Sequence, residues 1–92
     1  RINSMKALNE ELINATQRIV DELWNGGYCC GYLHSWLEYS LTDQLDEEEN
    51  ISITDIDEME EYLSEDLPEA CNECYEIVDM IIHRLREDHP DW

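Results

Sequence analysis

Lysine and arginine are absent from residues 19–83, a stretch that contains 19 aspartates and glutamates. The negative charge of this stretch equals the net charge of the whole 92-residue chain, −19, because the five basic and five acidic residues outside it cancel. Proteins neutralise nucleic-acid phosphates with lysine and arginine, so we expect no nucleic-acid binding. Anionic bilayer surfaces should also repel the chain.

The sequence also lacks a long apolar run. No segment approaches the roughly 20 apolar residues of a membrane span, and the N-terminal residues do not resemble a signal peptide. We therefore expect an intracellular, cytoplasmic protein whose four cysteines are thiols. Residues 1–4 precede Met5, and the sequence leaves open whether they are an added, flexible segment or an upstream start.

Glycine and proline are scarce, with three and two residues, and they fall where helical patterns end or begin. Ser4 is a candidate N-cap for a first helix that Gly26 and Gly27 terminate. A second helix is predicted from about Tyr28 to Leu45, antiparallel to the first. Apolar residues recur every three or four positions along both helices: Met5, Leu8, Leu12, Ala15, Ile19 and Leu23, then Cys29, Tyr32, Leu33, Trp36, Leu37, Leu41 and Leu45.

Two further helices are predicted after residue 53. Thr54 and Asp57 resemble a capping box for the third, whose buried side should be Ile56, Met59 and Leu63. Pro68 suits the first turn of the fourth, which should stop before His89-Pro90. Its apolar side reads Cys71, Cys74, Tyr75, Val78, Ile81, Ile82 and Leu85.

The predicted fold class is therefore all-α: about four amphipathic helices in a small bundle, forming one acidic domain over residues 1–92. The segment Ile51–Ile53 alternates but is short, so we expect it to be extended at most and too isolated to found a sheet.

Phenylalanine is missing, and the aromatic residues are three tryptophans and five tyrosines. Rings with a polar tip are enriched at partly buried interfaces. We expect the aromatic residues on the apolar stripes to fill the core, and those near helix ends to provide a homodimer contact. The first group is Trp24, Trp36, Tyr32 and Tyr75, and the second is Tyr28, Tyr39, Tyr62 and Trp92.

Most acidic residues fall off the apolar stripes, and on the third and fourth helices they recur every three or four positions. This spacing puts like charges about 5 to 6 Å apart, which costs a few tenths of a kcal/mol per pair. Such rows could imitate a nucleic-acid backbone. The residues predicted to replace phosphates are Asp46, Glu47, Glu48, Glu49, Asp55, Glu58, Glu61, Glu65, Glu69, Glu73, Glu76 and Asp79.

The amount of charge is also that of a duplex. A compact domain of this length has a radius of gyration near 12 Å, hence a diameter of about 32 Å. The same length of B-form DNA carries roughly 19 phosphates, at one charge per about 1.7 Å of axis. The alternative to imitation of a nucleic acid is a highly soluble acidic surface without a specific partner.

Other patterns could carry chemistry. Cys71 and Cys74 have metal-ligand spacing, and Cys29-Cys30 could complete a zinc site, although free cysteine on an apolar stripe also acts as a small hydrophobe. His34, His83 and His89 have no nucleophile at a recognised spacing, so we predict no catalytic residue.

Paired carboxylates on two helices resemble the metal-binding motifs of all-α nucleoside triphosphate pyrophosphohydrolases of the MazG type. The pairs are Glu58 with Glu61 and Glu76 with Asp79. A magnesium ion held there would activate water against a phosphoanhydride. The basic residues with which that family neutralises a triphosphate are missing from residues 19–83, so we expect no enzyme and no cofactor.

In overall character the chain resembles the small phage-encoded DNA-mimic anti-restriction proteins, in particular the Arn type of T-even bacteriophages. The resemblance runs from Met5-Lys-Ala-Leu-Asn-Glu-Glu-Leu-Ile through Asp43-Gln-Leu-Asp-Glu-Glu-Glu and the acidic helices to Trp92. It implies a homodimer that occupies the DNA-binding surface of the modification-dependent restriction endonuclease McrBC. It also implies attraction to nucleoid proteins such as H-NS. The competing hypothesis is an acidic adaptor that binds a basic protein without copying duplex geometry.

Overall fold

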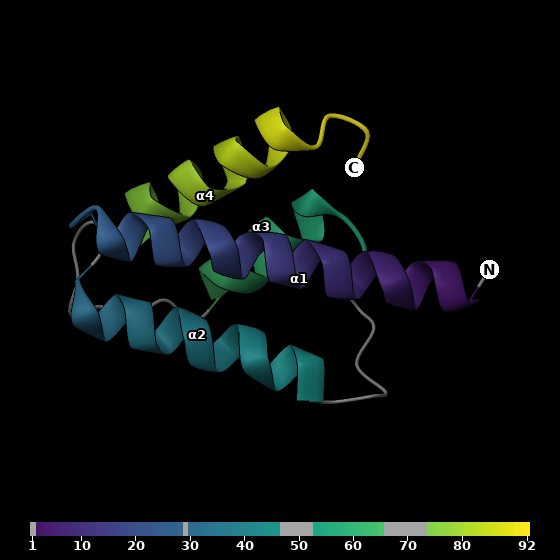
Figure 1. The fold of residues 1–92 in the computed structure, drawn as a ribbon, viewed down its shortest axis with the longest axis horizontal. Helices are drawn as coiled ribbons and strands as arrows, with labels where there is room; N and C mark the ends of the chain where they lie inside the picture. The colour runs from purple at the N-terminus through teal and green to yellow at the C-terminus, as the bar shows by residue number, and fades with distance from the viewer. Residues whose placement is uncertain (1, 29, 47–52, 66–73) are drawn as a thin grey trace.

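The computed structural model describes residues 2–28, 30–46, 53–65 and 74–92. These residues form four helices, α1 (Ile2–Asn25), α2 (Gly31–Asp46), α3 (Ile56–Glu65) and α4 (Cys74–Asp88), and the described ranges contain no strand. In Figure 1, α1 crosses the middle of the molecule with α2 on one side, α4 on the other and α3 behind it. The predicted all-α bundle is confirmed.

A Schellman motif ends α1. Gly27 has φ +79°, its N–H donates to the carbonyl of Trp24 at 3.1 Å, and the Tyr28 N–H donates to the carbonyl of Leu23 at 2.9 Å. The two glycines therefore stop the helix as predicted. The predicted N-cap at Ser4 is wrong, because the helix already includes Ile2.

The Schellman motif also explains why α2 begins at Gly31 and not at Tyr28. Tyr28 belongs to the turn, because its N–H is bonded to the carbonyl of Leu23. Cys30 caps the next helix, and its Sγ accepts a 3.4 Å hydrogen bond from the Leu33 N–H. The Cys30 carbonyl accepts from the His34 N–H at 2.9 Å, which is the first bond of the helix.

The cap of α3 lies one residue later than the sequence pattern indicated. Asp55 Oδ1 accepts a 2.8 Å hydrogen bond from the Glu58 N–H, and the Glu58 carboxylate reaches back to the N–H and hydroxyl of Thr54. Asp55 and Glu58 are thus the capping pair, in place of the predicted Thr54 and Asp57. The longer glutamate side chain can span the turn that an aspartate at residue 57 cannot.

The core is formed by the apolar faces of all four helices. Ile53, which precedes α3 in non-helical backbone, is also buried. Where the residues are described, the stripes of α3 and α4 were predicted correctly except for Tyr75, whose place Ile77 takes. Buried residues of the four helices include Leu12, Ile13, Val20, Leu33, Leu37, Leu41, Met59, Leu63, Val78, Ile81 and Leu85.

Three aromatic residues that we expected in the core lie on the surface. Trp24, Tyr32 and Tyr75 are exposed, and only Trp36 packs partly against the core. The stripe assignments failed because helical spacing places a residue on a face only to within about one position. Leucine and isoleucine at neighbouring positions fill the narrow space between the helices.

Several predicted features lie outside the described residues. They include Ile51 and Ser52 of the predicted extended segment, Pro68 at the predicted start of the last helix, Cys29 and Cys71. The end of α4 at Asp88, directly before His89-Pro90, is as predicted. No helix in the described ranges has the length and apolar character needed to cross a bilayer.

Candidate functional site

The twelve predicted phosphate substitutes divide into two groups. Glu47, Glu48, Glu49, Glu69 and Glu73 lie outside the described residues, and for Asp46 only the helical backbone is described. The other six lie on or next to α3 and α4, two helices that pack against each other. They are Asp55, Glu58, Glu61, Glu65, Glu76 and Asp79.

Two of these six carboxylates serve the fold itself. The Asp55 carboxylate accepts a hydrogen bond from a backbone N–H of α3. The half-buried Glu58 carboxylate accepts two hydrogen bonds, one from the N–H of Thr54 and one from its hydroxyl. The Thr54 hydroxyl lies 2.5 Å from Glu58 Oε1. Hydrogen bonds of this kind fix the carboxylates in place, so neither is a freely presented phosphate substitute.

The remaining four carboxylates are exposed and have no ion-pair partner among the described residues. They belong to two adjacent helices, with two residues from α3 and two from α4. We call this set the acid end of the bundle: Glu61, Glu65, Glu76 and Asp79.

The C-terminal part of α3, which carries Glu65, lies beside the N-terminal part of α4, which carries Glu76 and Asp79, because the two helices pack together and run antiparallel. Arg86, near the end of α4, lies 2.7 Å from Asp57 and 3.9 Å from Glu60, both near the beginning of α3. At 1.5 Å of rise per residue, Asp79 precedes Arg86 by about 10 Å, and Glu65 lies about as far beyond the pairing point on α3. Asp79 and Glu65 are therefore roughly level along the two helices.

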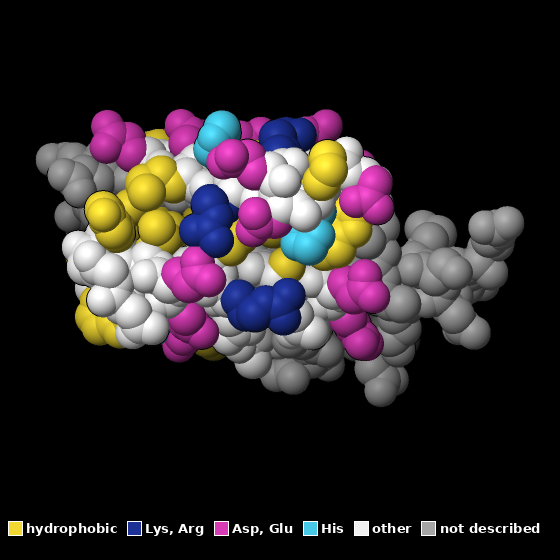
Figure 2. Space-filling view, turned by 45° about the horizontal axis from the view of Figure 1, so that its top comes forward, with side chains coloured by type: hydrophobic (Ala, Val, Ile, Leu, Met, Phe, Trp, Pro, Cys, Tyr) yellow, Lys and Arg dark blue, Asp and Glu magenta, His cyan; other side chains and the backbone are white. Residues whose placement is uncertain are grey.

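At the opposite end of this pair of helices, each of the two arginines pairs with two carboxylates. Arg84 lies 2.9 Å from Glu22 of α1 and 3.7 Å from Asp88. The hydrogen bond to Glu22 raises the pKa of Arg84, and the hydrogen bond to Asp57 raises that of Arg86, so both stay cationic. Figure 2 shows the face over α1 and α4, where dark blue cationic and magenta acidic side chains lie side by side.

An acidic pocket of about 210 Å³ opens beside α3. Three carboxylates, the ring of Tyr62 and an apolar floor at Ile53 line it. The Tyr62 hydroxyl donates a 2.9 Å hydrogen bond to the carbonyl of Ser40 on α2, which fixes the ring as a wall of the pocket. The lining carboxylates are Glu58, Glu61 and Glu65.

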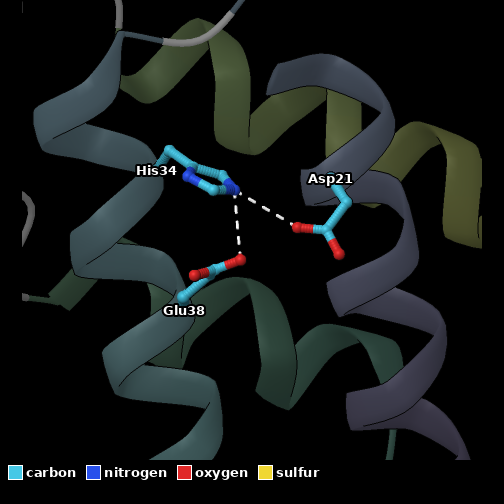
Figure 3. A group of neighbouring side chains, drawn as sticks. All are labelled: Asp21, His34 and Glu38. Atoms are coloured by element: carbon cyan, nitrogen blue, oxygen red, sulfur yellow. Dashed lines mark hydrogen bonds and ion pairs between the residues drawn. The ribbon is translucent and has the colours of Figure 1, made fainter. Parts of the chain in front are cut away.

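A second cluster joins α1 to α2. His34 Nε2 lies 3.2 Å from Asp21 Oδ1 and 3.2 Å from Glu38 Oε1, and Figure 3 shows both carboxylates directed at the same ring nitrogen. The indole of Trp24 stacks on the imidazole at 4.7 Å between centroids and 11° between planes. The His34 side chain is only 14 % exposed.

The sequence patterns gave His34 no catalytic role and did not predict this cluster. The spacing from His34 to Glu38 is one helical turn and could have been read from the sequence. The contribution of Asp21 could not, because it depends on how α1 and α2 are rotated against each other. His83 pairs with Glu87 at 2.9 Å on the surface of α4, and His89 stacks on Trp92 at 3.7 Å.

The magnesium site suggested by the sequence does not form among the described residues, whereas the zinc hypothesis stays a prediction because two of its cysteines lie outside them. There, only Asp21, His34 and Glu38 bring three ligand atoms within 4.8 Å of one another. The carboxylates of the magnesium hypothesis, Glu58 with Glu61 and Glu76 with Asp79, do not converge in that way. Of the cysteines, Cys30 is exposed and Cys74 is buried, while Cys29 and Cys71 lie outside the described ranges.

The aromatic residues proposed for a homodimer contact have different surroundings. Tyr28 and Tyr39 are exposed, whereas Tyr62 binds within its own chain and Trp92 packs partly against the core. Only the first two remain free to contact a second copy, and the homodimer stays a prediction.

Comparisons with protein-family models, with curated proteins and with solved structures find no match. The function must therefore be inferred from the geometry and charge of this chain, together with the overall sequence character described above.

Proposed function

We propose that the protein is a DNA mimic that inhibits a host DNA-binding enzyme by covering its DNA-binding surface with carboxylates. The observation that carries the proposal is the acid end. Four exposed carboxylates on two adjacent helices have no cationic partner among the described residues, while both arginines of α4 are paired elsewhere. Unpaired like charges oppose folding, so their arrangement calls for a function outside the fold.

The charge density on α3 and α4 supports this proposal. A carboxylate once per helical turn gives one charge per about 6 Å of helix axis, and two adjacent helices give one per about 3 Å. One strand of B-form DNA carries a phosphate every 3.4 Å or so. Over the acid end, the α3–α4 pair therefore carries about the linear charge density of one DNA strand.

The size of the molecule agrees with that interpretation. Its radius of gyration is 12.7 Å and its longest dimension is 39 Å. A duplex of that length carries about 23 phosphates, against a formal charge of −19 on the protein. An elongated anionic body of this kind matches a cationic cleft that binds a rod of DNA.

The acidic pocket is the place where we expect a basic side chain of the partner to bind. It is large enough for the end of one lysine or arginine side chain, and its walls combine carboxylates with an aromatic ring. A guanidinium can pair with a carboxylate in two hydrogen bonds and stack on a ring at the same time. We expect a phosphate-binding arginine of the partner to enter between Glu61 and Tyr62.

The partner class follows from the resemblance to Arn-type anti-restriction proteins. We propose the modification-dependent endonuclease McrBC as the primary target and the nucleoid protein H-NS as a second. The site of action would be the host cytoplasm, with a homodimer doubling the length of charged surface. Nucleic acid, membranes and catalysis have no part in the proposed mechanism, which is competitive occupancy driven by electrostatic attraction.

The direct test is inhibition of McrBC cleavage of modified DNA by the purified protein at several salt concentrations. We expect inhibition that unrelated duplex DNA relieves competitively and that weakens as salt is raised. An acidic adaptor would bind a basic partner without being displaced by duplex. Binding that duplex DNA does not displace, or absence of inhibition at low ionic strength, would contradict the proposal.

A matched pair of variants separates local arrangement from total charge. The first variant neutralises the acid end with Glu61→Gln, Glu65→Gln, Glu76→Gln and Asp79→Asn. The control neutralises four exposed acids elsewhere with Glu10→Gln, Glu11→Gln, Glu87→Gln and Asp91→Asn. We expect inhibition to fall and its salt dependence to become shallower mainly in the first variant. Equal losses of inhibition in the two variants would show that only the net charge matters and would contradict a role for the acid end.

A further inference from the structure

We propose that Asp21, His34 and Glu38 form a binding site for one divalent transition-metal ion of the zinc class, linking α1 to α2. The three ligand atoms are Oδ1, Nε2 and Oε1, and all lie within 4.8 Å of one another. Figure 3 shows that they come from two helices and face a common point. This site is independent of the acid end and of the proposed mimicry.

The separations fit a shared ion. Zinc binds nitrogen at about 2.0 to 2.1 Å and carboxylate oxygen at about 2.0 to 2.2 Å, so two ligands at the tetrahedral angle lie roughly 3.4 Å apart. The imidazole nitrogen is 3.2 Å from each carboxylate oxygen. An ion can therefore be placed between them with only small rotations of the two half-exposed carboxylate side chains.

Hydrogen bonding alone leaves the cluster incompletely satisfied. One ring nitrogen carries at most one N–H, yet two carboxylates face it at the same distance. Neither carboxylate has a lysine or arginine partner among the described residues, in contrast to Glu22 and Asp57. With a neutral imidazole the cluster carries two negative charges, which a divalent ion balances.

The surroundings hold the ligand ring ready for binding. Trp24 stacks on it from the end of α1, and the imidazole is largely buried. The two carboxylates are about half exposed, so an ion can enter from solvent and keep water at its remaining positions. A nitrogen ligand favours zinc, cobalt or nickel over magnesium and calcium, which prefer oxygen alone.

The experiment titrates the full chain, freed of metal by a chelator, with Zn²⁺ in a calorimeter. Millimolar Mg²⁺ is present throughout to occupy the surface carboxylates unspecifically. We expect one Zn²⁺ per chain, with affinity reduced at least ~10-fold by Asp21→Asn or Glu38→Gln. Both substitutions are nearly isosteric and replace half-exposed side chains, so the fold should persist, which circular dichroism checks.

The matched control is His83→Gln, which removes the other histidine–glutamate pair of the helices, one with a single carboxylate. It should leave Zn²⁺ affinity unchanged. Co²⁺ absorption identifies the ligands, because coordination by nitrogen and oxygen lacks the intense near-ultraviolet band of cysteine thiolates. Wild-type affinity in Asp21→Asn and Glu38→Gln, no stoichiometric binding, or a thiolate band on the bound Co²⁺ would each overturn the site.

Discussion

The hydroxyl of Tyr62 on α3 donates a 2.9 Å hydrogen bond to the backbone carbonyl of Ser40 on α2. This contact joins two helices that follow each other in the chain and fixes one wall of the acidic pocket. The sequence had suggested that the same tyrosine contacts a second copy. Its hydroxyl instead bonds within the chain, so we expect substitution of Tyr62 to affect the stability of the fold more than binding to a partner.

Tyr62→Phe should lower the free energy of unfolding by about 1 kcal/mol, because it removes a partly buried hydrogen bond and leaves the carbonyl of Ser40 without this donor. Urea denaturation followed by circular dichroism measures the change. Tyr39→Phe is the control, since that side chain is exposed. Equal stability of Tyr62→Phe and the wild type would contradict the contact.

Asp55→Ala should destabilise the protein by about 1 kcal/mol, since it removes the side chain that caps α3. It should affect binding to a cationic partner less than Glu61→Gln does, because the Asp55 carboxylate already accepts a backbone hydrogen bond. Thermal unfolding and a binding assay on the two variants separate these effects. A loss of binding without a loss of stability in Asp55→Ala would contradict this assignment.

Gly27→Ala should cost about 1 to 2 kcal/mol, because the backbone there has φ +79° and an added Cβ crowds the following carbonyl. Gly27→Asn should cost less, since asparagine tolerates that conformation. Gly31→Ala provides the contrast. Its Cβ would meet Trp24 only at ordinary contact distance, 3.6 Å, so that helical substitution should be neutral or stabilising. Similar losses at both glycines would contradict the turn geometry.

Salt should stabilise the protein. At 10 mM salt the Debye length is about 30 Å, close to the longest dimension of the molecule, 39 Å, so that carboxylates across the whole surface repel one another. At 1 M it falls to about 3 Å. We expect the melting temperature to rise by roughly 5 °C or more, which corresponds to about 1 kcal/mol. The variant with a neutralised acid end should rise less, and an unchanged wild-type melting temperature would argue against charge repulsion.

Much of the fold could be predicted from local patterns. Apolar spacing identified the buried faces of α3 and α4, and the glycine pair identified the end of α1. The capping pair was misplaced by one residue, because several acids near Thr54 satisfy similar spacings and only the backbone geometry chooses among them. The exposed positions of Trp24 and Tyr32 were missed because they depend on the rotation of each helix about its axis.

The site was predictable only in part. Helical spacing placed Glu61, Glu65, Glu76 and Asp79 on exposed surfaces, but it could not show that Glu58 is bound to Thr54. It also gave no sign that Asp21 would meet His34, because that contact depends on how two helices pack. Local charge patterns follow from the sequence, whereas the pairing of charges follows from the tertiary arrangement.

The antiparallel packing of α3 and α4 has a consequence for how the molecule meets other surfaces. Paired arginines lie at one extremity and unpaired carboxylates at the other, so the two extremities differ in which charges are open to a partner. A lysine or arginine of a cationic cleft would have to displace an existing ion pair at the first extremity, and would meet bare carboxylates at the second. Contact through the second extremity is therefore favoured, and the bundle should dock in one preferred orientation.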